Sequence, residues 1–455
     1  MASKLIDKRR IIRLNDTDAQ EGDYVLYWMQ ASQRSEWNHA LEYAIQRAND
    51  ANVPLLVCCV VHPESGIHTP RQLQFVLQGL REVRSSLDRR NVQFVLRVGQ
   101  PAKEVCRLAK EANEVVCDRG YLREQVALRQ QVASAANCAV WQIESDVIVP
   151  VESASTKREY AARTIRDQLN DAAEEFIQPL STTALNRSSS TVAADGLDPA
   201  EWDDLSQHYP FTDRVPAVDW LAGGTSQAKS RLRSFLDERL SDYRDRSAVN
   251  QENVSHLSAY LHFGQISPLA VYDAVGKAKA NRESRDDFLE ELLVRRELSF
   301  NFVHYESDYD SLSALPGWAE ETLKQHEDDP RSHHYTAQEL EGAETHDEAW
   351  NAMMREMKVR GYLHNHLRMY WGKKIIEWTN TVDHAHRTAL SLNNKYFIDG
   401  CDANSFANIL WLFGLHDRAY GERDVFGKVR YMSKGGLERK FDVEQYVERS
   451  ERLAG

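Results

Sequence analysis

The sequence predicts an α/β unit with a parallel sheet, followed by a linker and an all-helical unit. Up to residue 150, short apolar runs alternate with segments of helical periodicity. Residues 181–200 are small and polar, and strand patterns stop near residue 225. A chain of 455 residues is also too long for one hydrophobic core. We therefore expect a doubly wound, Rossmann-like unit over residues 22–150, a linker over 151–224 and a helical unit over 225–448.

The apolar runs of the first unit do not alternate with polar residues, which is typical of strands buried on both faces of a sheet. Such strands are expected at residues 24–29, 54–61, 92–98, 114–117 and 139–143. Helices are expected between them, at 38–49, 72–90, 101–112 and 123–136, and the charged residues 1–22 are expected to fray. A sheet of this type binds ligands at the carboxyl ends of its strands.

The second unit has apolar residues at helical spacing and no internal repeat. Helices are expected at residues 227–243, 268–280, 285–305, 344–379 and 382–394.

Composition excludes several classes of protein. No apolar run is long enough for a transmembrane helix, and the first residues lack the apolar core of a secretory signal. The six cysteines have no metal-binding spacing, so we expect a reduced, cytoplasmic protein without a zinc site. Neither the glycine-rich dinucleotide motif nor the phosphate-binding P-loop occurs, which argues against an ordinary dinucleotide oxidoreductase or nucleoside triphosphatase.

The net charge of −13 argues against indiscriminate binding to polyanions but leaves room for a local basic groove. The segment from Arg423 to Lys440 is the most basic window of the C-terminal half, and it interleaves aromatic residues and glycines. This pattern suits contacts with phosphates, although a solvated basic tail explains it equally well. The candidate phosphate contacts are Arg430, Lys434, Arg439 and Lys440.

Three tryptophans, Trp350, Trp371 and Trp378, are separated by 21 and 7 residues. On a helix, Trp371 and Trp378 would share a face about 10 Å apart along the axis. A file of indoles could carry an electron to a buried redox cofactor. On spacing alone, however, buried core aromatics are the better interpretation, since tryptophan dominates core packing.

Polar residues at three further places suggest a binding site. Ser258–Ser267 has small hydroxyl residues at helix starts, which suit a pyrophosphate group. Glu291 and Arg295 are four residues apart and form either a surface pair or part of a cavity wall. Arg368 and Asp399 flank a helical hairpin and are expected to form a buried ion pair beside a redox group.

Several of these segments together resemble a known family. Leu257–Ser267 is similar to the flavin-binding signature of the photolyase/cryptochrome family. The chain resembles class II cyclobutane-pyrimidine-dimer (CPD) photolyases in particular. This resemblance lies in the segments 27–29, 146–152, 290–298, 345–347, 367–371, 392–393, 399–400 and 426–432. The resemblance covers roughly residues 22–448.

The resemblance implies a bilobal fold with FAD held non-covalently in the helical unit. Arg368 and Asp399 would pair beside the flavin ring, and either Asn393 or Asn404 would face its redox-active nitrogen. Glu291 would bond the damaged pyrimidine, Trp411 would stack on it, and Arg246 and Arg295 would contact the DNA. The expected electron path is Trp371, Trp350, Trp378. The other expected cofactor contacts are Ser255, Ser258, Tyr260, Leu261, Gly264, Gln265, Ile266, Ser267 and Met369.

The implied function is light-dependent repair, in which photoexcited reduced FAD transfers an electron to a flipped-out CPD in DNA. The expected protein is a monomer with no membrane partner, and it has a possible second chromophore, a deazaflavin or a folate. Alternatives are a cryptochrome-like photoreceptor, a 6-4 photoproduct lyase and a non-photochemical nucleotide-binding adaptor. The chain departs from the family at Ala259, where Pro is usual, and at Asp402–Ser405, where an Asp-Pro-Asn-Gly run is usual, which leaves the loop geometry open.

Overall fold

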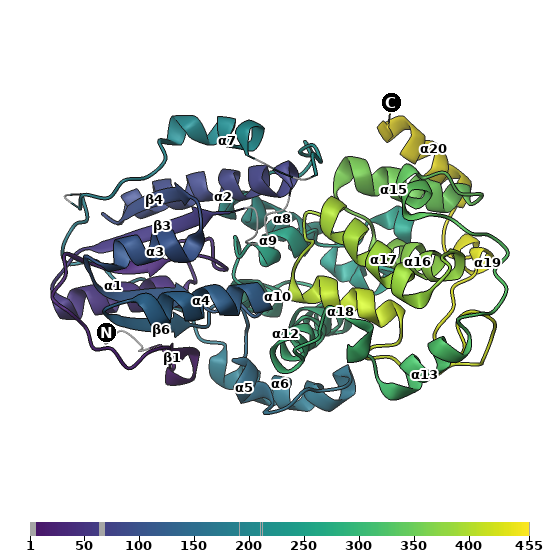
Figure 1. Ribbon diagram of the computed structural model, residues 1–455, viewed down its shortest axis with the longest axis horizontal. Helices are drawn as coiled ribbons and strands as arrows, with labels where there is room; N and C mark the ends of the chain where they lie inside the picture. Colours follow the sequence, from purple (N-terminus) through teal and green to yellow (C-terminus); the bar gives the residue numbers. More distant parts are fainter. Residues whose placement is uncertain (1–5, 63–68, 191, 210, 212, 455) are drawn as a thin grey trace.

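A six-stranded sheet with its helices forms one half of the molecule, and helices alone form most of the other half (Figure 1). The computed structural model describes residues 6–62, 69–190, 192–209, 211 and 213–454. The N-terminal end lies in the sheet half and the C-terminal end in the helical half (Figure 1). This arrangement confirms the predicted fold class.

The sheet has the strand order β1-β6-β5-β2-β3-β4, and all neighbours are parallel except β1 and β6. The predicted parallel strands are all present. The strands are β1 (Ile11–Arg13), β2 (Tyr24–Trp28), β3 (Leu55–Val61), β4 (Gln93–Val98), β5 (Ala112–Asp118) and β6 (Ala139–Ile143).

The expectation that residues 1–22 fray is wrong for the part that the structure describes. The short helix η1 (Lys8–Arg10) leads into β1, which pairs antiparallel with β6. Arg10 is 2% exposed and donates hydrogen bonds to the carbonyl oxygens of Glu144 and Val147 (both 3.1 Å). A buried guanidinium that satisfies backbone acceptors anchors this segment, a contact that charge composition alone cannot indicate.

Helices cover both faces of the sheet, as the continuous apolar strands predicted. On one face Leu26 and Trp28 pack in a core with residues of α3 (Pro101–Ala109) and α4 (Arg123–Ala135). On the other, Val25 and Tyr27 pack in a core with residues of α1 (His39–Ala51) and α2 (Pro70–Asp88). Side chains alternate between the faces because a strand has a period of two residues.

The expected linker, residues 151–224, contains helices of its own. They are α5 (Val151–Ala154), α6 (Ala162–Phe176), η2 (Pro199–Glu201) and α7 (Trp202–His208). Much of the polar stretch between α6 and η2 lies against the sheet half, where Ser189 Oγ donates to Leu55 O (2.5 Å) and Leu197 N to Leu96 O (2.7 Å). The second bond covers the edge strand β4, which would otherwise expose unpaired backbone groups.

The helical half begins at α8, and two of its predicted long helices are interrupted. The segment 344–379 forms two helices that are separated at Gly361, whose φ of +61° ends the first. The segment 285–305 contains a π-helical turn, η5.

The elements of the helical half are α8 (Thr225–Glu238), η3 (Leu240–Asp245), η4 (Val249–Gln251), α9 (Ser258–His262), α10 (Pro268–Lys277), α11 (Arg282–Leu289), η5 (Glu290–Arg295), α12 (Arg296–Tyr305), η6 (Leu312–Ala314), α13 (Gly317–Gln325), α14 (Ala337–Gly342), α15 (Glu348–Arg360), α16 (Asn365–Trp378), α17 (Val382–Tyr396), α18 (Ala403–Leu412), α19 (Lys434–Glu438) and α20 (Val443–Ala454).

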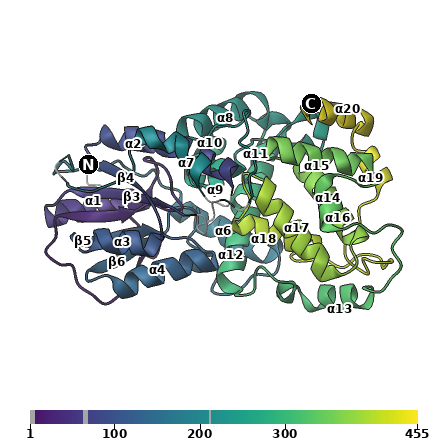
Figure 2. The ribbon, with the colours of Figure 1, turned by 45° about the horizontal axis from the view of Figure 1, so that its top comes forward.

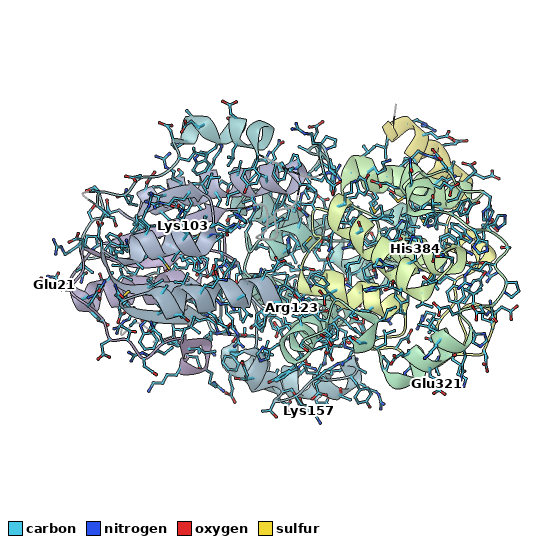
Figure 3. The ribbon with its side chains drawn as sticks, viewed as in Figure 1. Glu21, Lys103, Arg123, Lys157, Glu321 and His384 are labelled. Atoms are coloured by element: carbon cyan, nitrogen blue, oxygen red, sulfur yellow. The ribbon has the colours of Figure 1, made fainter. Side chains whose placement is uncertain are left out.

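The two halves lie side by side (Figure 2), and polar contacts as well as packing join them. Arg71 on α2 donates to the carbonyl oxygens of Tyr396 (2.6 Å) and Lys358 (2.5 Å) at the ends of α17 and α15. Arg123, which Figure 3 labels where the halves meet, pairs with Asp310 (2.8 Å). Among the helices of the described residues, none is long and apolar enough to span a bilayer.

Candidate active site

A small cavity at the helical half brings together residues from four distant segments of the chain. The backbone is unusual at two of them: His256 has φ +54° just before α9, and Gly361 has φ +61° between α15 and α16. A non-glycine residue at positive φ is uncommon, and such strain often marks functional sites. The cavity is lined by Trp220, Leu221, His256, Ser258, Ala259, Gly361, Tyr362, Ile398 and Asp399.

The expected ion pair of Arg368 and Asp399 lies at this cavity. The guanidinium Nη2 is 3.0 Å from one carboxylate oxygen and 3.2 Å from the other. Arg368 also donates from Nε to Leu363 O (3.0 Å) and lies 3.8 Å from the ring centroid of Phe397. The carboxylate is therefore held in place by a cation that is itself fixed on two sides.

Two buried histidines, His256 in the cavity wall and His364 two residues after Tyr362, have a ring nitrogen without a hydrogen-bond partner, Nδ1 of His256 and Nε2 of His364. Burial lowers the pKa of His256 to about 4 and also lowers the pKa of His364. Both rings are therefore neutral at neutral pH. An unsatisfied buried group costs about 1–3 kcal/mol, so a ligand that bonds these nitrogens would remove the cost.

The two neighbouring glutamates of η5 point to different partners. Glu290 accepts two hydrogen bonds from Arg166 on α6 (2.8 and 3.0 Å), which ties it to the outside of the helical half. Glu291 pairs with Arg246 (3.2 Å), and its charge together with burial raises the pKa of Tyr243. A π-helical turn often occurs at functional sites, and here it separates the two carboxylates.

Trp411, near the end of α18, is half-buried between two cations. Lys373 Nζ lies 5.2 Å from its ring and the Arg430 guanidinium 5.4 Å, within reach of cation–π attraction. Lys373 itself is fully buried and donates to Leu412 O (2.5 Å), and burial lowers its pKa to about 7. Arg430 is fixed by Asp417 (3.0 Å).

The two candidate asparagines lie on different helices. Asn393 is 5% exposed in the last turn of α17, six residues before Asp399, and donates to Asn394 Oδ1 (2.9 Å). Asn404 is in the first turn of α18 and donates to Asp402 Oδ2 (3.2 Å). Met369 is half-buried next to Arg368 on α16, and Ser255 is half-buried next to His256.

The three tryptophans of the expected file are all buried and adjacent to one another. Trp350 donates from its indole nitrogen to Trp371 O (2.9 Å), and its ring lies 5.7 Å from that of Trp378. Trp378 in turn contacts Tyr335, with ring centroids 5.6 Å apart. Trp350 thus contacts both other tryptophans, through the backbone of Trp371 and the ring of Trp378, and the order of the electron path stays a prediction.

Part of the expected cofactor set is placed elsewhere. Gln265 is fully buried, accepts from Gly224 N (2.6 Å) and donates to Phe75 O (3.1 Å), so it joins the two halves. A Cβ on Gly264 would lie 1.9 Å from Ala31 O, so this turn packs against the sheet half. Tyr260 donates to Ala222 O (2.7 Å) and Leu261 lines a different hollow. Ile266 and Ser267 are also buried outside the lining of the cavity. The cofactor roles expected for these residues therefore stay predictions, and among Ser258–Ser267 the small cavity is lined by Ser258 and Ala259.

The expected DNA-contacting residues are spread over several elements. Arg295 is half-exposed and pairs with Glu290 (3.2 Å), whereas Arg246 pairs with Glu291. Lys434, Arg439 and Lys440 are exposed on and after α19. Lys440 contributes to lowering the pKa of His366 on α16, so its charge lies near that helix.

Sequence reasoning missed His256, Tyr362, His364 and Lys373. Two of them had a usable signal, because His256 lies between Ser255 and Ser258 and Lys373 follows Trp371 within two residues. Nothing in the sequence shows, however, that a ring nitrogen stays unpaired or that a lysine is buried.

A second hollow, lined by more residues than the first, lies between the carboxyl ends of the strands and the helical half. Asp146 lines it beside Arg296 (3.3 Å), and burial raises the pKa of this carboxyl to about 7. Buried oxygens of Gln30 and Gln33 in its wall have no hydrogen-bond partner. We refer to this hollow as the strand-end cleft.

The molecule combines an α/β half with a helical half that carries the small polar cavity, and known proteins share this fold. A photolyase of Agrobacterium tumefaciens, described as class III, matches with a TM-score of 0.73 at 19% identity, over 95% of this chain and 87% of that one. A cryptochrome of Synechocystis matches with a TM-score of 0.71 at 15% identity, over 94% and 87%. At these identities the likeness concerns the fold alone.

Sequence comparison identifies the family. Residues 25–185 match the family model of DNA photolyase. The deoxyribodipyrimidine photo-lyase of Methanothermobacter thermautotrophicus is 45% identical over 449 residues, 98% of either chain. That of Oryza sativa is 38% identical, over 98% of this chain and 91% of the relative. The chain belongs to the DNA photolyase family.

Proposed function

We propose that this protein repairs cyclobutane pyrimidine dimers in DNA with the energy of light. The observation that carries the proposal is 45% identity to a deoxyribodipyrimidine photo-lyase along nearly the whole of both chains. The motifs that resemble class II photolyases favour the same substrate. The alternative is a cryptochrome-like receptor that does not repair DNA. Two groups of the helical half argue against it, the carboxylate of Glu291 and the indole of Trp411.

The residues around the small cavity fit FAD. The unpaired Nδ1 of His256, the hydroxyl of Ser258 and the fixed Asp399 carboxylate offer both donors and acceptors to a flavin nucleotide. FAD, when bound, supplies light absorption and one-electron chemistry. Arg368 and Asp399 would fix its ring, and Asn393 would lie near the ring because it precedes Asp399 at the end of α17.

The lesion side of the site is proposed to comprise Glu291, Arg246 and Trp411. A flipped dimer has a flat apolar face and carbonyl oxygens, which suit an indole and a hydrogen-bonding carboxyl group. Arg246 holds Glu291 in place and offers a positive charge to a phosphate or a base edge. Distorted stacking at the dimer lowers the cost of flipping, which favours damaged over undamaged DNA.

We also propose that Trp371, Trp350 and Trp378 return electrons to the cofactor when it has become oxidised. Their burial shields the indoles from water, and their contacts make a continuous path toward Tyr335.

The strand-end cleft is proposed to hold a second, light-harvesting chromophore. A photolyase of Sulfolobus tokodaii of similar fold is described with two FAD molecules, and it matches with a TM-score of 0.71 at 13% identity. The unpaired amide oxygens of Gln30 and Gln33 would bond a heteroaromatic ring there.

The test is illumination of the purified, reduced protein with an oligonucleotide that contains one dimer. We expect loss of the dimer only in the light, with a wavelength dependence that follows the reduced flavin. A flavin-containing protein that leaves the dimer intact would instead support the receptor function. Protein that contains no flavin after expression in a flavin-replete host would contradict both.

A further inference from the structure

The tryptophan file does not end at Trp378, because an aromatic cluster continues from it to the surface. Trp378 contacts Tyr335 (ring centroids 5.6 Å apart) and His346 (5.1 Å). His346 is stacked on His333, with centroids 3.5 Å apart and planes 10° apart. Trp378 is 2% exposed, whereas Tyr335 is half-exposed and His346 exposed. The cluster therefore links the buried file to solvent.

Two hydrogen bonds connect the Tyr335 hydroxyl to His346. The backbone N–H of His346 donates to Tyr335 Oη (2.9 Å), so this oxygen already accepts a bond. The same oxygen lies 2.8 Å from Nδ1 of His346. Tyr335 therefore donates its proton to Nδ1, provided that the imidazole is neutral and carries its own proton on Nε2. The backbone of Tyr335 is also held, because its N–H donates to Trp378 O (3.1 Å).

We propose that Tyr335 and His346 form a proton-coupled end to the tryptophan file, in which Tyr335 gives an electron to oxidised Trp378 and its proton to His346. The electron leaves the phenol ring and fills the vacancy in the indole. The phenolic O–H bond breaks, and the proton forms an N–H bond at Nδ1 of His346. The products are reduced Trp378, a neutral tyrosyl radical and an imidazolium ion. The inference rests on the proposed function only for the light reaction that oxidises the file.

A soluble thiolate can complete the cycle, because Tyr335 is accessible to solvent. The thiolate gives one electron to the tyrosyl radical and becomes a thiyl radical, and the proton returns from Nδ1 to the phenolate oxygen. Without a base beside it, an oxidised tyrosine would have to lose its strongly acidic proton to water. His346 instead removes the proton at the moment of electron transfer, which stops the electron from returning inward.

The surroundings of His346 keep it able to accept a proton. Partial burial and the facing His333 lower the pKa of His346, so the ring is neutral near pH 7. The other charges that face it are Asp347 at the start of α15 and Lys374 and Glu377 on α16. The two carboxylates offset the lysine and His333 once the imidazolium has formed.

A second tyrosine provides a matched comparison. Tyr370 also donates to a base, Asp347 Oδ2 (2.6 Å), and it is adjacent to Trp371 in the sequence. It is fully buried, however, and of the two tyrosines only Tyr335 contacts a tryptophan ring of the file in the described part of the molecule. Tyr370→Phe is therefore the control for Tyr335→Phe.

The experiment is pulse radiolysis of the intact protein with azide radicals, which oxidise tryptophan without light, flavin turnover or DNA. Transfer is followed as decay of the tryptophanyl absorbance and growth of the tyrosyl absorbance. We expect Tyr335→Phe to lose a distinct part of the tyrosyl signal and Tyr370→Phe to retain it. His346→Phe, which keeps a ring but no base, should slow this phase by about a hundredfold or more. His346→Gln, which replaces the ring by an amide, should slow this phase similarly. It takes the place of His346→Phe if the Phe variant folds poorly.

The dependence on pH separates a proton acceptor from a structural contact. In the unaltered protein the phase should slow as the pH falls through the pKa of His346, because protonation fills Nδ1, and it should also slow in D₂O. Both effects should vanish in His346→Gln. The inference is overturned by an unchanged rate in both His346 variants, or by a signal that survives Tyr335→Phe and is lost in Tyr370→Phe. Failure of dimer repair would leave this measurement intact, so the two proposals fail separately.

Discussion

The sheet half and the helical half differ in where their backbone departs from regular geometry. In the sheet half the positive-φ residues other than glycine are Trp37, Asn52 and Asn91, and asparagine tolerates this conformation. In the described part of the helical half they are Glu252, His256, Ala343, Cys401, His416 and Val425, and the four that are not histidine belong to types that rarely adopt it. Each such residue costs on the order of 1–3 kcal/mol.

Two of the departures in the helical half, His256 and Cys401, lie at or close in sequence to residues of the candidate site. His256 lies in the cavity wall, Cys401 follows Asp399 by two residues, and η5 carries Glu291. The sheet half thus provides a stable, regular support, while the helical half gives up local backbone stability to place polar groups. Four predictions test this division, each with a control variant.

The largest effect is expected from Trp371→Phe. Because Trp371 is the tryptophan of the file that follows Arg368 on α16, its loss should abolish photoreduction of the oxidised cofactor. Repair by protein that was reduced chemically beforehand should remain close to normal. Absorbance of the flavin during illumination measures the first effect, and the control is Trp141→Phe in the sheet half. Equal photoreduction in both variants would remove Trp371 from the path.

Asp399→Ala should release the cofactor and destabilise the fold. It leaves Arg368 partly buried and unpaired, with an expected loss of roughly 2–4 kcal/mol, below the full value for a buried pair because the guanidinium keeps some exposure. Flavin retained after gel filtration and urea denaturation measure the two effects. Glu175→Ala, which breaks the exposed pair with Arg9, should cost less than about 1 kcal/mol. Flavin retained in Asp399→Ala would place the cofactor elsewhere.

Glu291→Ala should lower the repair yield by up to roughly a hundredfold while the flavin stays bound, because it removes a hydrogen-bonding group that we propose faces the lesion. Glu291→Gln, which keeps hydrogen bonding, should be less affected. Glu290→Ala is the control, since Glu290 is bound to Arg166. Repair yield per absorbed photon is the measurement. A defect in Glu290→Ala with normal repair in Glu291→Ala would reverse the assignment.

The smallest effect concerns the exposed cations on and after α19. The double variant Lys434→Ala, Arg439→Ala should bind undamaged DNA more weakly and reduce the slope of log affinity against log salt by about two, one for each phosphate contact. The control is Lys103→Ala with Arg107→Ala on α3, whose charges lie in the sheet half. Fluorescence anisotropy at several salt concentrations decides between the two surfaces. If the Lys434→Ala, Arg439→Ala variant has the same salt slope as the unaltered protein, the α19 cations are solvated.

The sequence by itself determined the elements that follow from local periodicity. Continuous apolar runs predicted β2 to β6, and helical spacing predicted α1 to α4. The motifs indicated the family and pointed to Ser258, Arg368 and Asp399, which lie at one cavity. These features depend on neighbours in the chain or on residue types that recur together, so they are visible without coordinates.

Only the tertiary structure decided which polar groups meet. In the structure β1 pairs with β6, and Gln265 lies at the junction of the halves. Glu290 forms an ion pair with Arg166, whereas Glu291 forms one with Arg246. The tertiary structure also set Tyr335 against His346 at the end of the tryptophan file. Such contacts join segments that are distant in the chain. They depend on the direction that the backbone takes after a turn at a few residues. No local pattern of side chains encodes that direction.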